Sequence, residues 1–229
     1  MSKIEQATNK RNNQRRILEI FVDLPAKALV KYGFTPNILS YCGFFCSIAV
    51  TILLSLGGLH FPFRIAWIVP FLMFWAGAFD VFDGEVARMT HKISNSGAFL
   101  DSNLDRLSDA VIVLGLIIGG YFNYIIGYTI LFLIIMISYI RSRAENEGID
   151  MKGIGFMERA ERLIILWFAF IAEFWMSFAS TIFPDIHFIF ELFFPIFTII
   201  FIGLLILTIA QRLIFTFKEL SKIEAHEKN

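Results

Sequence analysis

Four aspartates stand out as residues whose type and spacing could do chemistry. Asp80 and Asp83 lie three positions apart, and Asp101 and Asp105 lie four positions apart. On helices, each pair shares one face about one turn apart. The segments beside them are strongly apolar, and a carboxylate in such surroundings is costly unless a cation or polar partner accompanies it. We therefore predict that the four carboxylates share a bound cation.

The predicted cation is a divalent metal ion with oxygen ligands. The four candidate ligands are all carboxylates, and such sets suit Mg²⁺, Mn²⁺ or Ca²⁺ rather than zinc. Two such ions close together would stabilise the attacking and leaving oxygens of a displacement at phosphorus. Gly84 and Gly97 leave room for a ligand beside the aspartates. Arg88 adds a cation suited to a phosphate.

These residues together resemble a known family pattern, D-x2-D-G-x2-A-R-x8-G-x3-D-x3-D, which belongs to the CDP-alcohol phosphatidyltransferases. The matching positions, with no departure in spacing, are Asp80, Asp83, Gly84, Ala87, Arg88, Gly97, Asp101 and Asp105. The resemblance implies an integral membrane enzyme that transfers a phosphatidyl-type group from a CDP-linked lipid to an alcohol and releases CMP. It also implies two divalent ions, Mg²⁺ or Mn²⁺, and a homodimer among membrane lipids.

The resemblance further implies roles for single residues. Asp80, Asp83 and Asp101 become metal ligands, and Asp105 becomes both a metal ligand and the general base. The implied nucleotide-binding residues are Asn37, Asp83, Gly84, Ala87, Arg88 and Gly97. For Asn37, an ordinary helix start after a threonine cap and a proline is an equally good interpretation.

The composition indicates a membrane protein. Hydrophobic residues make up 57% of the 229, 27 of them are Phe, and the mean hydropathy is +0.67. The formal net charge is zero, so nothing indicates nucleic acid as a partner. Apolar runs near the length of a membrane-spanning helix cover residues 36–56, 65–82, 99–122, 123–144, 160–182 and 187–215. We predict an all-α integral membrane bundle of six transmembrane helices.

Positive charge predicts the orientation. With six spans, the termini and the loops around 85–98 and 145–158 share one side, and that side together with its helix ends holds all of the 20 Lys and Arg residues except Arg64. This bias predicts cytoplasmic termini and a cytoplasmic active site in a multi-pass protein of the cell membrane. The predicted parts are 1–34, 35–216 as the catalytic membrane domain, and 217–229 as a cytoplasmic tail. Residues 1–34 fit either an amphipathic surface helix or a solvated cap.

A second group of charges is basic and lies at the predicted cytoplasmic helix ends. Its members are Arg141, Arg143, Arg159, Arg162 and Arg212. They fit either a membrane anchor or a pocket for an acceptor that already carries a phosphate. The pattern is similar to the family branch that makes phosphatidylinositol phosphate or archaetidylinositol phosphate. That similarity implies inositol phosphate as the phosphorylated polyol, with glycerol 3-phosphate as the alternative acceptor.

A different class of function also places acidic residues inside a membrane. A divalent-cation transporter would explain the aspartates, but it explains neither Gly84, Ala87 and Arg88 at their offsets nor the basic group. The sequence fits either acyl or isoprenoid tails on the lipid donor, and either Mg²⁺ or Mn²⁺ as the physiological metal. Asp109 continues the aspartate stripe and is expected to have a buried hydrogen-bonded partner. Glu173, near the middle of the 160–182 run, also needs a partner, and no chemistry is assigned to it.

Overall fold

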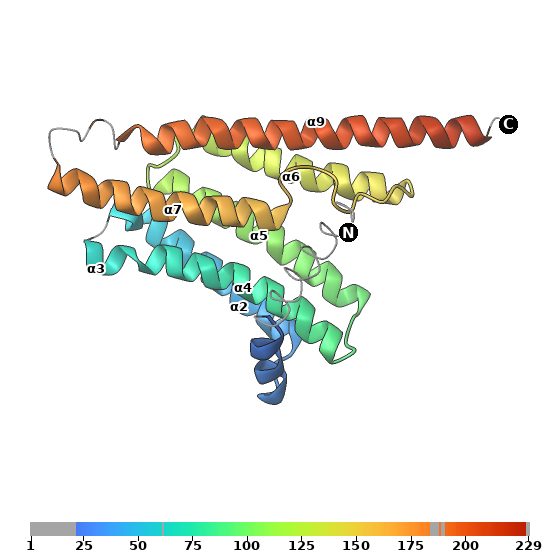
Figure 1. The fold of residues 1–229 in the computed structure, drawn as a ribbon, viewed down its shortest axis with the longest axis horizontal. Helices are drawn as coiled ribbons and strands as arrows, with labels where there is room; N and C mark the ends of the chain where they lie inside the picture. Colours follow the sequence, from blue (N-terminus) through green and yellow to red (C-terminus); the bar gives the residue numbers. More distant parts are fainter. Residues whose placement is uncertain (1–21, 61, 184–187, 189–190, 228–229) are drawn as a thin grey trace, which may run out of the picture. The chain divides into compact units, whose positions relative to one another are not determined.

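A computed structural model describes residues 22–60, 62–183, 188 and 191–227. Every regular element in these residues is a helix, so the all-α prediction is confirmed. The elements in chain order are α2 (Pro36–Ser55), the 3-10 turn η1 (Gly58–His60), α3 (Phe63–Ala66), α4 (Ile68–Met89), α5 (Asn95–Ile118), α6 (Tyr124–Asn146), α7 (Arg159–Ile182) and α9 (Phe193–Glu227) (Figure 1). Residues 22–31 form a further helical segment before α2, and residues 1–21 of the predicted surface helix lie outside the described part.

Six long helices correspond to the six predicted apolar runs. Four of them, α2, α6, α7 and α9, are long and apolar enough to cross a membrane by length and composition. The other two, α4 and α5, carry the charges of the aspartate motif. The helix α4 continues through this motif to Met89, and α9 continues to Glu227, because neither stretch contains a proline or glycine run that would end a helix.

One compact unit combines residues 22–46 with residues 75–105. Its buried core consists of Ala26, Leu39 and Val86, with partly buried apolar side chains packed around them. At the start of α2, the Thr35 hydroxyl accepts the backbone N–H of Ile38 at 3.4 Å, as expected for an N-cap before a proline. The unit therefore holds the start of α2, the end of α4 and the start of α5, which together carry the whole aspartate motif.

A second compact unit combines residues 47–74 with residues 106–227. Its core is built from α2, η1, α4, α5, α6, α7 and α9, and α9 runs alongside α6 (Figure 1). Glycine is required where α5 meets α2: a Cβ on Gly119 would lie 2.1 Å from the carbonyl oxygen of Leu54. The turn after α5 covers residues 119–123. Asn123 caps α6 by accepting the backbone N–H of Ile126 at 2.9 Å.

Candidate active site

Three of the four predicted metal ligands converge. Asp80 of α4 and Asp101 and Asp105 of α5 each offer a carboxylate oxygen, and these oxygens lie within 4.8 Å of one another. All three side chains are half-buried. Among the described residues, this is the single group of three or more His, Cys, Asp or Glu side chains arranged closely enough for one ion. An all-oxygen set of this kind fits Mg²⁺ or Mn²⁺.

The fourth carboxylate, Asp83, is oriented by a neighbouring hydroxyl. Ser40 of α2 donates a hydrogen bond of 2.6 Å to Asp83 Oδ2, and Asp83 is 5% exposed. Burial, and then the charges of Asp101 and Asp80, raise the pKa of Asp83 to about 7, while the Ser40 bond lowers it. Asp83 is the first residue after the apolar stretch 65–82, so its carboxyl group lies at the end of that predicted span. A divalent cation beside these carboxylates would favour the ionised form of Asp83.

A pocket of about 240 Å³ lies beside these carboxylates, inside the same compact unit. Asp101 lines it and is also one of the three converging ligands. All six predicted nucleotide-binding residues line it: Asn37, Asp83, Gly84, Ala87, Arg88 and Gly97. Gly97 permits a close approach here, because a Cβ at this position would lie 3.0 Å from Ser94 Oγ and 3.7 Å from Asn37 Oδ1.

The pocket has polar lining residues that the sequence analysis did not single out. These are Ser40, Lys92 and Ser94. Ser40 lies three positions after Asn37 on α2, so helical spacing could have predicted that both face the same site. Lys92 lies in the gap between Arg88 and Gly97, where the family pattern leaves residue types open, so no signal pointed to it.

Arg88 does not point freely into the pocket. Its Nη2 and Nε donate to Glu85 Oε2 at 2.6 Å and 3.0 Å, and its side chain is 60% exposed. This ion pair is exposed and spans a single helical turn, so it contributes little to stability. Arg88 can therefore exchange Glu85 for a phosphate at small cost.

The predicted acceptor arginines belong to the second compact unit and differ in their surroundings. Arg162 of α7 donates from Nη2 to Asp109 Oδ2 at 2.7 Å, and both side chains are buried. Asp109 thus has the buried partner that its position predicts. The Nε of Arg162 is buried and hydrogen-bonds to none of the described residues. Arg141 and Arg143 pair with glutamates one turn later on α6 and are partly exposed.

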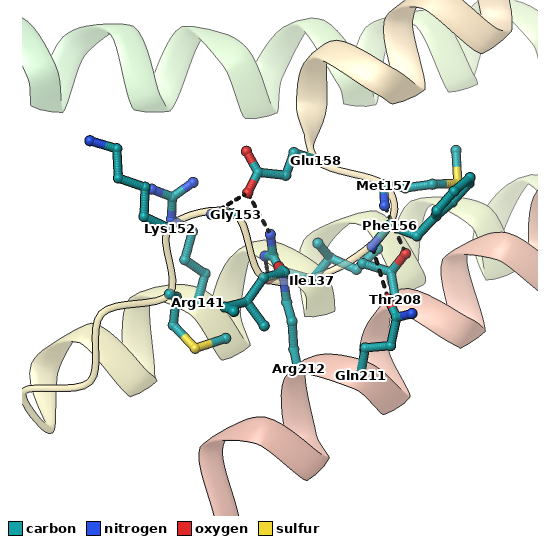
Figure 2. A network of polar contacts seen from close by, with 12 residues as sticks. Ile137, Arg141, Lys152, Gly153, Phe156, Met157, Glu158, Thr208, Gln211 and Arg212 are labelled. Carbon is teal, nitrogen blue, oxygen red and sulfur yellow. Dashed lines mark hydrogen bonds and ion pairs between the residues drawn. The ribbon is translucent and has the colours of Figure 1, made fainter. Parts of the chain in front are cut away.

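Arg212, the fifth predicted acceptor residue, is buried among backbone carbonyls. It is 2% exposed and donates from Nε to the carbonyl of Ile154 at 2.9 Å and from Nη1 to the carbonyl of Ile137 at 2.7 Å. Its Nη2 lies 4.0 Å from Glu158 Oε1. Figure 2 shows its guanidinium reaching from α9 into the α6–α7 connection. Because two of its nitrogens are committed to backbone carbonyls, Arg212 mainly supports that connection.

Two more α9 side chains hold the same connection. Thr208 Oγ1 accepts the backbone N–H of Met157 at 3.1 Å, and Gln211 Oε1 accepts that of Phe156 at 2.9 Å (Figure 2). Gly155, directly before Phe156, has a φ of +107°. The connection immediately before Arg159 is therefore fixed against α9 by side-chain bonds to its backbone.

Comparison with protein families decides the assignment. The model of the CDP-alcohol phosphatidyltransferase family matches residues 34–217. The chain belongs to this family. The matched residues include the three converging aspartates and every residue that lines the pocket beside them.

Individual members of the CDP-alcohol phosphatidyltransferase family are similar to this chain over more than half of its length. Archaetidylinositol phosphate synthase of Pyrococcus horikoshii is 40% identical over 145 residues, which cover 62% of this chain and 72% of that protein. Phosphatidylinositol phosphate synthase of Mycobacterium tuberculosis is 34% identical over 148 residues, covering 62% and 64%.

Two crystal structures of that mycobacterial synthase have a similar fold. The structure with CDP-DAG bound has a TM-score of 0.66 and 27% identity, covering 85% of this chain and 92% of that one. The structure in complex with manganese and citrate has a TM-score of 0.67, covering 84% and 87%. In both comparisons, the shared region extends well beyond the aspartate motif.

Proposed function

We propose that the protein transfers a phosphatidyl or archaetidyl group from a CDP-linked lipid to inositol phosphate and releases CMP. The observation that carries this proposal is the overlap of two sites at Asp101, which belongs both to the converging carboxylates and to the adjoining pocket. A metal-bound diphosphate needs carboxylate ligands directly beside a nucleotide pocket. The names of the similar synthases support inositol phosphate as the acceptor.

Asp80, Asp101 and Asp105 would hold a divalent ion, Mg²⁺ or Mn²⁺, and Asp83 would contribute to a second ion. When bound, such ions stabilise negative charge on the diphosphate oxygens. Asp105 accepts the proton of the acceptor hydroxyl. The hydroxyl oxygen then forms a bond to the lipid-side phosphorus while the bond from that phosphorus to the CMP oxygen breaks, and CMP leaves.

The remaining pocket residues bind and orient the donor. Asn37, Gly84, Ala87 and Gly97 shape the space for the cytidine and its phosphates, and the small residues leave room for close contact. Arg88 releases Glu85 and binds a phosphate oxygen. Lys92 supplies a second positive charge at the same pocket.

The acceptor phosphate is bound by Arg159 and Arg162 on α7, with Arg141 and Arg143 of α6 adding positive charge. The environment of Arg162 supports this assignment. Its Nη2 donates to Asp109, whereas its buried Nε donates a hydrogen bond to none of the described residues. An arginine held in this way offers its remaining donors to an anion. Arg212 contributes by holding the connection that leads into α7.

The same proposal includes the arrangement in the membrane. All Lys and Arg residues except Arg64 lie on one side of a six-span topology, so the active site and both termini face the cytoplasm. The parts of this arrangement are a juxtamembrane segment of residues 1–34, a catalytic membrane domain of residues 35–216 and a tail of residues 217–229. Two chains form a homodimer in the cell membrane.

CMP release from purified protein tests the proposal. The assay contains a CDP-lipid and Mg²⁺ or Mn²⁺, with inositol phosphate, glycerol 3-phosphate, free inositol or serine offered separately. We expect release with inositol phosphate, and a large loss in Arg159→Ala. Release with glycerol 3-phosphate instead would establish the alternative acceptor, and release with serine or free inositol would reduce the arginines to a membrane anchor.

The transporter alternative makes the opposite prediction. No release with any acceptor, together with metal uptake into vesicles, would refute the transferase. A rise in melting temperature on adding CMP with Mn²⁺ would argue against a transporter, because a cation pathway has no nucleotide site.

A further inference from the structure

Glu173 is a buried carboxylate that the proposed reaction does not use. It lies on α7, roughly 21 Å along the helix from Arg159 at 1.5 Å per residue. The residue is 8% exposed, in a helix apolar enough to cross a membrane. A carboxylate in such a place is costly and marks a functional site unless its partners fully account for it.

Only one of the two carboxylate oxygens of Glu173 has a hydrogen-bond partner among the described residues. His60 Nε2 lies 2.9 Å from Glu173 Oε1, whereas Oε2 is buried and hydrogen-bonds to none of the residues that the structure describes. The ring of Tyr121 lies 5.3 Å from that of His60, and its hydroxyl accepts the backbone N–H of Leu59 at 3.0 Å.

A hollow of about 390 Å³ adjoins this group, and we name it the acidic pocket. Its polar lining residues are His60, Tyr121, Glu173, Ser177, Ser180 and Glu191. The aromatic ring of Phe194 also lines it, and its described lining contains neither Lys nor Arg. Two carboxylates with one imidazole give the acidic pocket a formal charge of −2 when His60 is neutral and −1 when it is protonated.

We propose that the acidic pocket binds the ammonium group of an organic cation. The carboxylates supply charge-assisted hydrogen bonds to its N–H groups, and the rings of Tyr121 and Phe194 offer faces to a cation. A bare metal ion fits less well, because the hollow is far larger than an ion. In addition, the described residues converge closely enough for a metal only at the aspartate group. A soluble amine and an amine-headed lipid share this chemistry.

Binding measurements on the full-length protein test this site and separate the two sources. One arm titrates ethanolamine into detergent-purified protein and records melting temperature and tryptophan fluorescence. The other compares nanodiscs of phosphatidylethanolamine with nanodiscs of phosphatidylglycerol. We expect a saturable response, with the Kd raised about tenfold or more in Glu173→Gln, because a neutral amide replaces a charged acceptor.

The controls keep the test decisive. Glu161→Gln makes the same change at an exposed position of α7 and should leave the Kd unchanged. If Glu173→Gln does not fold, Glu191→Gln, at the exposed second carboxylate, should still weaken binding. Response to soluble ethanolamine supports a soluble ligand, and response only in phosphatidylethanolamine nanodiscs supports a lipid headgroup.

Three results would overturn the proposal. The first is no saturable response in either arm. The second is an equal response in the wild type and in both pocket variants. The third is a response to Zn²⁺ but not to ethanolamine that disappears in Glu173→Gln, which would make the acidic pocket a metal site. Because binding is measured without CDP-lipid or acceptor, none of these results depends on the transferase proposal.

Discussion

Ser40 donates a 2.6 Å hydrogen bond to Asp83, and this bond joins α2 to the aspartate motif of α4. One oxygen of the carboxylate is thereby held on the α2 side, while Asp80, Asp101 and Asp105 converge without it. The relationship divides the four aspartates into a group of three and a fourth whose orientation depends on a serine outside the motif.

Ser40→Ala removes this bond and leaves Asp83 free to rotate. A hydrogen bond to a charged group contributes about 1.5–3 kcal/mol, so we expect kcat/KM for the CDP-lipid to fall about tenfold or more. Mn²⁺ binding, followed by electron paramagnetic resonance, should weaken in parallel. Ser40→Thr should keep most of both properties. Ser55→Ala, which removes a hydroxyl that donates to the carbonyl of Thr51 on the same helix, is the matched control.

Asp105→Asn keeps the size of the side chain and removes its ability to accept a proton. We expect turnover to fall by about 10²–10⁴, the usual contribution of general base catalysis. CMP binding in the presence of Mn²⁺ should persist, as measured by the shift in melting temperature. Asp23→Asn, at a partly exposed aspartate on the 22–31 helix, should retain full activity. Full activity in Asp105→Asn would disprove the base assignment.

Metal removal should affect stability as well as activity. An ion at a concentration of 100 times its Kd adds about 2.7 kcal/mol to the free energy of unfolding. Chelation should therefore lower the melting temperature and stop CMP release, and Mn²⁺ should restore both. In Asp80→Ala, Mn²⁺ should produce a much smaller rise in melting temperature. An unchanged rise in this variant would place the ion elsewhere.

Gly155→Ala should loosen the connection between α6 and α7. A Cβ at this position would lie 2.9 Å from Thr208 Cγ2 and 3.0 Å from Arg212 Nε, and the φ of +107° is strained for any other residue. We expect a loss of about 1–3 kcal/mol in stability, measured by thermal unfolding. Gly203→Ala is the control, since a Cβ on this α9 glycine would meet nothing within 4 Å.

Arg162→Met should be strongly destabilising, because it leaves Asp109 buried without its cation. Breaking one partner of a buried ion pair typically costs about 3–5 kcal/mol. Arg143→Met, which breaks an exposed pair with Glu147 at the end of α6, should change stability by less than about 0.5 kcal/mol. Similar melting temperatures for the two variants would show that the buried pair contributes no more than the exposed one.

Much of the helical framework and the core of the site follow from local sequence. Apolar runs long enough to cross a membrane, with a threonine cap and Pro36 at the first helix start, are local signals, and long helices cover the greater part of each run. The spacing of Asp101 and Asp105 is likewise a property of a single helix. The exact ends of α4 and α9 were not predictable, because polar residues continue a helix as readily as apolar ones.

Tertiary structure alone decided which polar side chains meet. Three side-chain contacts join residues that are 43, 53 and 113 positions apart in the sequence. They are Ser40 with Asp83, Asp109 with Arg162, and His60 with Glu173. No periodicity encodes such pairs, because they depend on how helices approach one another. Arg212 illustrates the same limit: its charge predicted a phosphate ligand, and only the packing shows that its Nε and Nη1 donate to the carbonyls of Ile154 and Ile137. The sequence by itself thus determined which chemical groups are present and on which helix faces, and packing decided which of them became partners.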